Sequence, residues 1–374
     1  MVDGLIGRGH HISMIRPRQR TDEGRSGEAG EGTAGRISER LTRAITIPGY
    51  QQLQLGAAWP RTLQRSWQAS PPDLVHVVTE GPLGWAAVIA ARRLGIPVSS
   101  DFHTNFHSYS RHYGMGILST PVAALLRLLH NWCDCTMVPT GEMRRDLATL
   151  DFRRLAIVSR GIDTGLFSPA RRSDELRRSW NCGPSDTVVI CVSRIAAEKN
   201  LDLFVRTTRA MRTINPAIRV VIVGDGPELA ELRKRAPEII FAGMQTSEAL
   251  AAHYASGDLF LFPSITETFG NVTVEAMASG LAVLAYDYAA AREYIEDGVS
   301  GVLAPYDDAE AFVTRATSML QSSACLPGLR VKARERALLV SADRALDELE
   351  QVSLAVAERA EVLPTGTIIS ARLS

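Results

Sequence analysis

Two glutamates, Glu267 and Glu275, stand on either side of a predicted helix start. An apolar strand at 258–262 leads into a glycine turn, and a helix is expected from Asn271 to the glycine at position 280. A helix start offers unpaired backbone N–H groups and the positive end of a dipole, which suit a phosphate. Because helical side chains lean toward the N-terminus, Glu275 is expected to reach back over that phosphate site, with Glu267 on its rim. Two acceptor carboxylates around an anion site indicate the hydroxyl groups and the diphosphate of a nucleotide sugar.

A second loop carries two cations, Arg194 and Lys199, between a predicted strand at 187–192 and a helix at 201–214. Fixed cations stabilise the charge that a departing diphosphate develops, without any proton transfer. Lys199 is the only lysine among the first 233 residues, where arginine fills the other cationic positions. A lysine in so arginine-rich a chain favours a requirement for a compact point charge. The alternative interpretation is a pair of solvated surface cations.

Two further strand ends give weaker signals. The turn at 224–227, Gly-Asp-Gly-Pro, lacks the third glycine of a dinucleotide fingerprint. A structural strand-to-helix turn is therefore favoured, with the backbone of Gly224 as a candidate wall of the site. The next predicted strand ends at Gly243 and Met244. Their loop is either a plain turn or a backbone contact for the nucleotide base.

In the first half of the chain, a polar cluster that includes His103 and Tyr109 follows a predicted strand at 97–102. Its three histidines lack metal-type spacing, so a site role for His103 is favoured over zinc binding. Glu80 and Trp85 follow a predicted strand at 73–78, where they either contact the acceptor or sugar, or Trp85 packs in the core. No Asp-x-Asp triplet follows a strand, so no metal cofactor is expected, and the two cations of the second loop would take its place.

Strands alternate with helices throughout the sequence, which predicts parallel sheets covered on both faces. The expected fold class is α/β, with two doubly wound Rossmann-like domains and an interdomain cleft. Parallel sheets bind ligands at the carboxyl ends of their strands, where all the candidate residues fall. The expected domains are residues 1–165 on the acceptor side, residues 166–341 for the nucleotide sugar, and residues 342–374 as a helix that crosses back and a tail.

The start of the chain departs from this pattern. Residues 1–10 read as the end of a helix with a glycine cap, and a strand at 11–15 follows. The first strand and glycine loop of a doubly wound domain are therefore expected to be absent. An upstream start codon is the hypothesis, with a fragment or a compensating fold as the alternatives. Residues 19–36, rich in Gly, Glu and Arg, are predicted to form a mobile loop.

Length and composition favour two domains in a reducing compartment. The chain has 374 residues, too many for one ordinary core, and its 5 cysteines form no disulfide-like framework. No apolar run is long enough to span a bilayer, so a cytoplasmic location is expected. Residues 1–165 hold nineteen arginines against fourteen acidic residues, although the whole chain is neutral. The excess of positive charge in this half reflects either chance or peripheral contact with the inner face of a membrane. No nucleic-acid partner is expected.

Taken together, the two glutamates, the two cations, the turn at 224–227 and the stretch at 159–163 resemble the retaining family 4 glycosyltransferases of the GT-B fold. The stretches at 80–84 and 103–114 are similar to GDP-mannose-dependent α-mannosyltransferases and related glycolipid-forming enzymes. The resemblance implies that a hexose, with mannose expected, moves with retention of configuration from GDP-mannose or a UDP-hexose to a lipid or saccharide acceptor. A truncated, non-catalytic remnant that binds the nucleotide sugar and a GT-B nucleotide-sugar epimerase are the alternatives.

The resemblance also implies a role for each candidate residue. Glu267 would hold hydroxyls of the donor sugar, Glu275 would hold the ribose, and His103 would lie beside the transferred sugar. Arg194 and Lys199 would bind the diphosphate. The implied donor-binding set also includes Gly224, Gly243, Met244, Phe269, Gly270, Asn271 and Val272. The implied acceptor set is Glu80, Trp85 and Tyr109.

Overall fold

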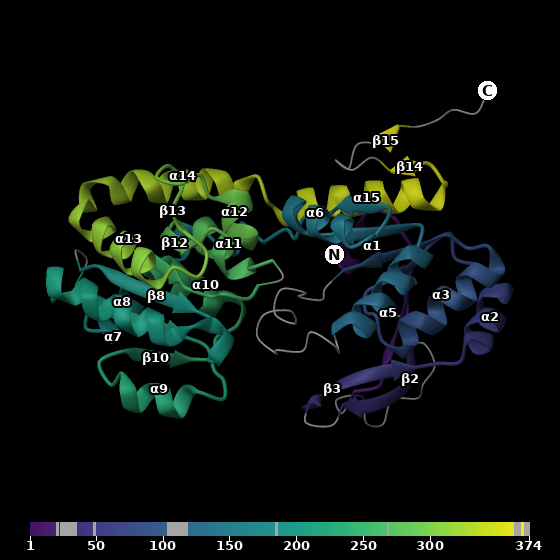
Figure 1. The fold of residues 1–374 in the computed structure, drawn as a ribbon, viewed down its shortest axis with the longest axis horizontal. Coiled ribbons are helices and arrows are strands. Elements are labelled where there is room, and N and C mark those ends of the chain that lie inside the picture. The colour runs from purple at the N-terminus through teal and green to yellow at the C-terminus, as the bar shows by residue number, and fades with distance from the viewer. Residues whose placement is uncertain are drawn as a thin grey trace. The chain divides into compact units, whose positions relative to one another are not determined.

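The computed structural model describes residues 1–19, 22, 36–47, 50–102, 119–183, 186–267, 269–362 and 368–369. The chain divides into two compact units, Met1–Ser159 with Ala345–Ser374 (unit 1) and Arg160–Arg344 (unit 2) (Figure 1). Each unit has its own parallel sheet, which confirms the predicted α/β class. The predicted loop at 19–36 lies outside the described residues except for positions 19, 22 and 36.

Unit 2 is built on a six-stranded parallel sheet. Its strands are β8 (Val188–Val192), β9 (Arg219–Val223), β10 (Ile240–Gly243), β11 (Leu259–Phe262), β12 (Ala282–Tyr286) and β13 (Val302–Ala304). Their order in the sheet is β10-β9-β8-β11-β12-β13, so the first and fourth strands of the unit lie side by side. Every residue of β8, β11 and β12 is buried, as expected of a sheet with both faces covered.

Helices cover this sheet and complete one apolar core. They are α7 (Asp174–Ser179), α8 (Leu201–Ile214), α9 (Leu229–Arg235), α10 (Ser247–Ser256), α11 (Asn271–Ala278), α12 (Ala289–Tyr294), α13 (Ala309–Gln321) and α14 (Leu326–Leu338). The helix predicted at 201–214 has those bounds in the structure, because its apolar residues recur at helical spacing and bury one face. The helix expected after the turn at 224–227 is α9, whereas α7, α12 and α14 were not predicted from the sequence.

Unit 1 contains a four-stranded parallel sheet and a separate three-stranded sheet. The parallel sheet runs β4 (Val75–Val77), β5 (Val98–Asp101), β6 (Cys135–Val138) and β7 (Leu155–Ile157). In the smaller sheet, β1 (Ile12–Pro17) pairs parallel with β2 (Ile37–Ile47), which pairs antiparallel with β3 (Tyr50–Ala57). The helices of this part are α1 (Val2–Gly7), α2 (Pro60–Ala69), α3 (Pro82–Leu94), α5 (Ser119–Trp132) and α6 (Gly141–Thr149). The sequence analysis did not predict β2, β3, α2 or α6.

The helix α15 (Ala342–Ala357) brings the end of the chain into unit 1. Its residues Val352 and Val356 share an apolar cluster with Met137 of β6 and Ala156 of β7. The hydroxyl of Ser159 donates to Oε2 of a glutamate in the same helix, at position 348, over 2.6 Å. The last strands, β14 (Glu361–Val362) and β15 (Ile368–Ile369), pair antiparallel after this helix. Among the described residues, no helix combines the length and apolar character needed to cross a membrane.

Candidate functional site

The order of strands in unit 2 places two candidate loops next to each other. An open parallel sheet forms a crevice beyond the carboxyl ends of its strands at the point where the strand order reverses. In unit 2 this point lies between β8 and β11, which pair through Val189 and Ile190. The loop after β8 carries Arg194 and Lys199, and the loop after β11 carries Glu267. The candidate cations and this candidate carboxylate therefore meet at the switch point.

Lys199 and Glu267 form a direct ion pair in this crevice. Nζ of Lys199 lies 2.5 Å from Oε1 of Glu267, and the two side chains are only 17% and 15% exposed. The same oxygen accepts a hydrogen bond of 2.8 Å from the hydroxyl of Ser264. The ammonium also lies 5.7 Å from the ring centre of Phe262. No partner of Oε2 of Glu267 occurs among the described residues, so that oxygen can accept hydroxyl groups from a ligand.

Arg194, the other cation of the loop, extends into solvent. Its side chain is 61% exposed, and its nearest carboxylate is that of Glu198, at 3.9 Å. Such an exposed, screened pair contributes little to stability. The guanidinium can therefore move to an incoming anion without breaking a strong contact.

The glycine turn after β9 holds the cation loop in place. Gly224 has φ +140°, and a Cβ there would lie 1.9 Å from the carbonyl oxygen of Ser193. A Cβ at Gly226 would lie 2.2 Å from the carbonyl oxygen of Ile195. The N–H of Ile195 donates to the carbonyl of Asp225 over 2.9 Å. These contacts favour the structural interpretation of the turn, which supports the backbone beside Arg194.

The end of β10 adds little side-chain chemistry to this region. The carbonyl of Gly243 accepts a hydrogen bond of 2.9 Å from the N–H of Gly224, which ties the two strand ends together. The side chain of Met244 is exposed. The backbone of this loop and the exposed side chain of Met244 are therefore both available for contact with a base.

The start of α11 is held firmly beside Glu267. Gly270 has φ +94° and caps the helix, a left-handed conformation that glycine adopts without strain. The buried Phe269 accepts a hydrogen bond of 2.7 Å at its carbonyl from Ala290, and the hydroxyl of Tyr288 donates to the carbonyl of Glu267 over 2.9 Å. The first N–H groups of a helix have no partner within it, so those near Asn271 can bind an anion.

Glu275 lies one turn into α11, and its side chain is partly buried. The hydroxyl of Tyr254, on α10, donates to Oε2 of Glu275 over 2.9 Å. Burial raises the pKa of the Glu275 carboxyl above its usual value, although the hydrogen bond from Tyr254 opposes this shift. Tyr254 was not predicted from the sequence, because a tyrosine in an alanine-rich helix gives no signal that distinguishes a hydrogen-bond donor from a core residue.

In unit 1, Glu80 follows β4 and faces a buried histidine. Nε2 of His130 lies 3.5 Å from Oε1 of Glu80, while Nδ1 is 2.9 Å from the hydroxyl of Ser100 on β5. His130 is buried within α5 and also reaches the hydroxyl of Thr136 on β6. This histidine was not predicted from the sequence, since a lone histidine in an apolar helix is usually structural.

The remaining candidates of unit 1 fall into two groups. The ring of Trp85 meets that of Trp132 edge-on, with centres 5.8 Å apart, and Trp85 packs against the apolar cluster of this unit. The contact with Trp132 and the packing against the apolar cluster both fit the alternative in which Trp85 packs in the core. His103 and Tyr109 lie outside the described residues.

Comparisons with known proteins agree with this geometry. A family model described as Glycosyltransferase Family 4 matches residues 1–166, and a model described as Glycosyl transferases group 1 matches residues 186–322. A GDP-mannose-dependent alpha-mannosyltransferase from Mycolicibacterium smegmatis is 32% identical over 321 residues, which cover 86% of this chain and 82% of the relative. An alpha-monoglucosyldiacylglycerol synthase from Streptococcus pneumoniae is 29% identical over 246 residues, 62% of this chain and 55% of the relative.

Solved structures share the fold. A sucrose-phosphate synthase from Thermosynechococcus elongatus superposes with a TM-score of 0.75, covering 95% of this chain and 91% of that one, at 18% sequence identity. At that identity the likeness concerns the fold alone. Two parallel-sheet units of this kind are the GT-B arrangement, which confirms the predicted fold class.

Proposed function

Since the chain belongs to glycosyltransferase family 4, a family of retaining enzymes with the GT-B fold, we propose that it transfers mannose from GDP-mannose to a lipid acceptor. Membership of the family means that the chain transfers a sugar from a nucleotide sugar. The identity of the sugar and of the acceptor is the proposal.

One observation carries the proposed donor site: the contact of Lys199 with Glu267 beside the start of α11. A diphosphate at this helix start would receive backbone N–H groups and the ammonium of Lys199. Oε2 of Glu267 would then accept hydroxyls of the sugar. The carboxylate of Glu275, one turn further along, would accept the hydroxyls of the ribose.

The proposed chemistry uses the cations to stabilise the leaving group. The bond between the anomeric carbon and the phosphate oxygen breaks while the acceptor oxygen attacks the same face, so the configuration is retained. The acceptor proton passes to an oxygen of the departing diphosphate. Lys199 and Arg194 stabilise the negative charge that develops on that group, and neither of them gains or loses a proton in this scheme.

Mannose is proposed because of the first of the two relatives. That relative is named for its dependence on GDP-mannose and matches over 86% of this chain, whereas the glucosyl-named relative matches over 62%. Relatives with about the same sequence identity to this chain are thus named for different sugars. The donor must therefore be tested directly.

A lipid acceptor is proposed because of the surface of unit 1. The helix α5 exposes Val122, Leu125 and Leu128, which recur every third residue and so share one side of the helix. The same part of the chain is rich in arginine, which favours an anionic surface. The name of the second relative, which contains diacylglycerol, also supports this class of acceptor.

A product assay tests the proposal. The full chain is incubated with GDP-mannose, GDP-glucose or UDP-glucose, together with either a phospholipid extract or free oligosaccharides, and products are identified by mass spectrometry. The expected result is a mannosylated lipid that forms only with GDP-mannose. A glucosylated product would overturn the choice of sugar, and transfer to oligosaccharides alone would overturn the choice of acceptor. Nucleotide binding without any product would favour a non-catalytic binding protein, and an isomerised donor would favour an epimerase.

A further inference from the structure

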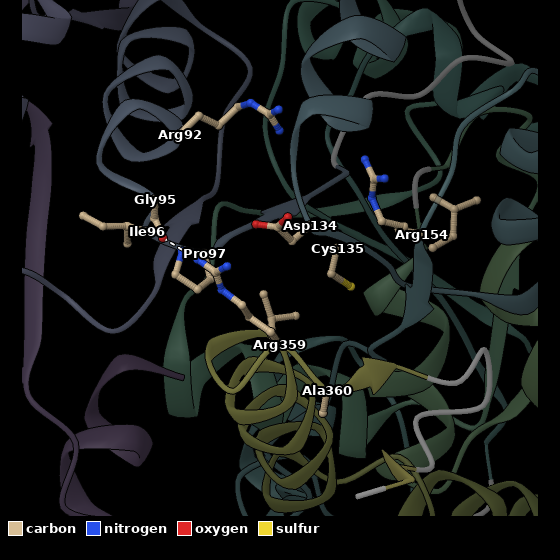
Figure 2. Close-up of a pocket in the computed structure, with 11 residues that line it drawn as sticks. Arg92, Gly95, Ile96, Pro97, Asp134, Cys135, Arg154, Arg359 and Ala360 are labelled. Atoms are coloured by element: carbon tan, nitrogen blue, oxygen red, sulfur yellow. Dashed lines mark hydrogen bonds between the residues drawn. The ribbon is translucent and has the colours of Figure 1, made fainter. Parts of the chain in front are cut away.

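A cavity of about 510 Å³ lies within unit 1 (Figure 2). Pro97 precedes β5, Asp134 precedes β6 and Arg154 precedes β7, and all three residues line the cavity. The cavity therefore opens at the amino ends of these parallel strands. Glu80 follows the carboxyl end of β4, on the opposite edge of the same sheet. The cavity is thus separate from the proposed acceptor residues.

Three arginines from distant parts of the sequence converge on this cavity. Arg92 lies in the last turn of α3, Arg154 lies just before β7, and Arg359 follows α15. Figure 2 shows their side chains arriving from three different segments around Asp134.

Each of the three guanidinium groups is anchored to a backbone carbonyl. Arg92 donates to the carbonyl of Trp132 over 2.8 Å, Arg154 donates to that of Cys133 over 3.0 Å, and Arg359 donates to that of Gly95 over 2.6 Å. A guanidinium has five N–H donors, so each group keeps donors for another partner. Within the described ranges, none of the three arginines forms an ion pair with a carboxylate. The three groups are therefore oriented but not neutralised.

The rest of the lining completes an environment for an anion. Among the described residues that line the cavity, Asp134 alone is acidic, and its Oδ2 already accepts a hydrogen bond of 2.8 Å from the N–H of Val98. The lining thus carries two net positive charges, which match a phosphate monoester dianion. Burial raises the pKa of the Cys135 thiol in the wall to about 12, so this group is neutral and adds no negative charge.

We propose that this cavity binds a phosphate group, carried either by a small soluble phosphate or by the headgroup of a lipid. Planar guanidinium groups suit phosphate, since each can donate two parallel hydrogen bonds to its oxygens. The site lies outside the proposed donor and acceptor regions, and it does not depend on the proposed function. Because the three arginines are exposed to solvent, binding weakens as ionic strength rises.

Calorimetric titration of the full chain with inorganic phosphate, at constant ionic strength maintained with chloride, tests the site. Arg92→Gln and Arg359→Gln are each expected to weaken binding roughly tenfold, which corresponds to about 1.4 kcal/mol. Arg93→Gln is the matched control, since Arg93 neighbours Arg92 on α3, is exposed and does not line the cavity. Equal affinity of wild type, Arg92→Gln and Arg359→Gln would overturn the proposal, as would an equal loss in Arg93→Gln.

Two further variants separate this site from misfolding and from the donor site. Asp134→Asn removes the negative charge while keeping an oxygen acceptor for Val98, so it should tighten phosphate binding, a gain that a damaged fold would not produce. Lys199→Ala should leave this binding intact, because Lys199 lies in unit 2. If Lys199→Ala abolishes all phosphate binding, or Asp134→Asn weakens it, the proposal is wrong.

Co-sedimentation distinguishes the two sources of the phosphate. Vesicles of phosphatidylcholine with phosphatidic acid are compared with vesicles of phosphatidylcholine alone, using the same variants. Binding to the phosphatidic acid vesicles that falls in Arg92→Gln and Arg359→Gln, but not in Arg93→Gln, assigns the site to a lipid headgroup. Binding of inorganic phosphate without binding to the phosphatidic acid vesicles assigns the site to a soluble phosphate. A loss of vesicle binding that is the same in all three arginine variants would contradict a headgroup site.

Discussion

Nζ of Lys199 lies 2.5 Å from Oε1 of Glu267, and this contact joins the loop after β8 to the loop after β11. The two strands are neighbours at the point where the order of the sheet reverses. The carboxylate therefore holds the ammonium at the place where an open parallel sheet binds its ligand. We expect the ammonium to bind the diphosphate of the donor as well as this carboxylate. The ammonium would need to move little to reach the diphosphate.

The first prediction concerns the only lysine of this loop. Lys199→Ala should lower kcat at least tenfold, about 1.4 kcal/mol of barrier, since the charge on the leaving diphosphate loses a fixed cation. Steady-state kinetics with the nucleotide sugar measures the change. Lys234→Ala is the control, because Lys234 is exposed on α9 and pairs with Glu231 of the same helix. Equal kcat values for wild type and Lys199→Ala would remove this lysine from the mechanism.

Glu275 gives a prediction about pH. Burial raises its pKa in the folded protein above the usual value of 4.5, so ionisation of this carboxyl costs the folded state free energy. The carboxyl of Glu275 contributes fully to the stability of the folded protein when the pH is below its usual pKa. This contribution is lost as the pH rises through the raised pKa of the folded state. Glu275→Gln should therefore stabilise the ligand-free protein at neutral pH, and this advantage should shrink as the pH falls toward 4.5.

Thermal unfolding over a pH series measures this difference, and the same variant tests the ribose contact. Glu275→Gln should show a smaller rise in melting temperature on addition of the nucleotide sugar, because an amide is a weaker acceptor for hydroxyls than a carboxylate. A difference in stability between wild type and Glu275→Gln that stays the same at all pH values would contradict the burial of an ionised carboxylate.

Two glycines of the site should differ in their sensitivity to alanine. At Gly270, φ is +94° and the nearest atoms to a new Cβ are 3.6 Å away, so Gly270→Ala should cost only the conformational strain of about 1–2 kcal/mol. At Gly224, a Cβ would also lie 1.9 Å from the backbone oxygen of Ser193. Gly224→Ala should therefore be the more destabilising of the two in urea unfolding. The reverse order would show that the turn does not pack on the cation loop as described.

A cluster of arginines around Asp258 supports the core of unit 2. The carboxylate lies 3.0 Å from Arg172, 3.1 Å from Arg177 and 3.2 Å from Arg330, and the side chain of Arg177 is only 2% exposed. Asp258→Asn leaves a buried cation without its counter-charge, which typically costs about 3–5 kcal/mol.

Glu310→Gln is the control for this prediction. Glu310 pairs with Arg206 over 2.9 Å at the surface, and such pairs contribute less than about 1 kcal/mol. Chemical unfolding compares the two variants. A loss in Asp258→Asn no larger than that in Glu310→Gln would show that the cluster contributes nothing to stability.

The alternation of apolar strands and amphipathic helices was enough to predict the architecture of unit 2. The helix at 201–214 has the predicted bounds, because burial of one face leaves a clear period in the sequence. The strands β2 and β3 of unit 1 escaped prediction. In β2, the charged residues Glu39, Arg40 and Arg43 interrupt the apolar positions, so the pattern of a buried strand is absent.

The candidate site was predictable only in part. Residue type and position after a strand brought Lys199 and Glu267 forward as candidates, but their direct contact depends on the order of β8 and β11 in the sheet, which local sequence does not encode. Tyr254 and His130 were missed for the same reason, since each acts through a partner far away in the sequence.

The most direct test of the account is a crystal structure of the protein with GDP-mannose or GDP. The expected result is a diphosphate within hydrogen-bonding distance of Nζ of Lys199 and of the backbone N–H groups at the start of α11, with the ribose hydroxyls on Glu275. A nucleotide bound elsewhere, with the ion pair of Lys199 and Glu267 unchanged, would contradict it.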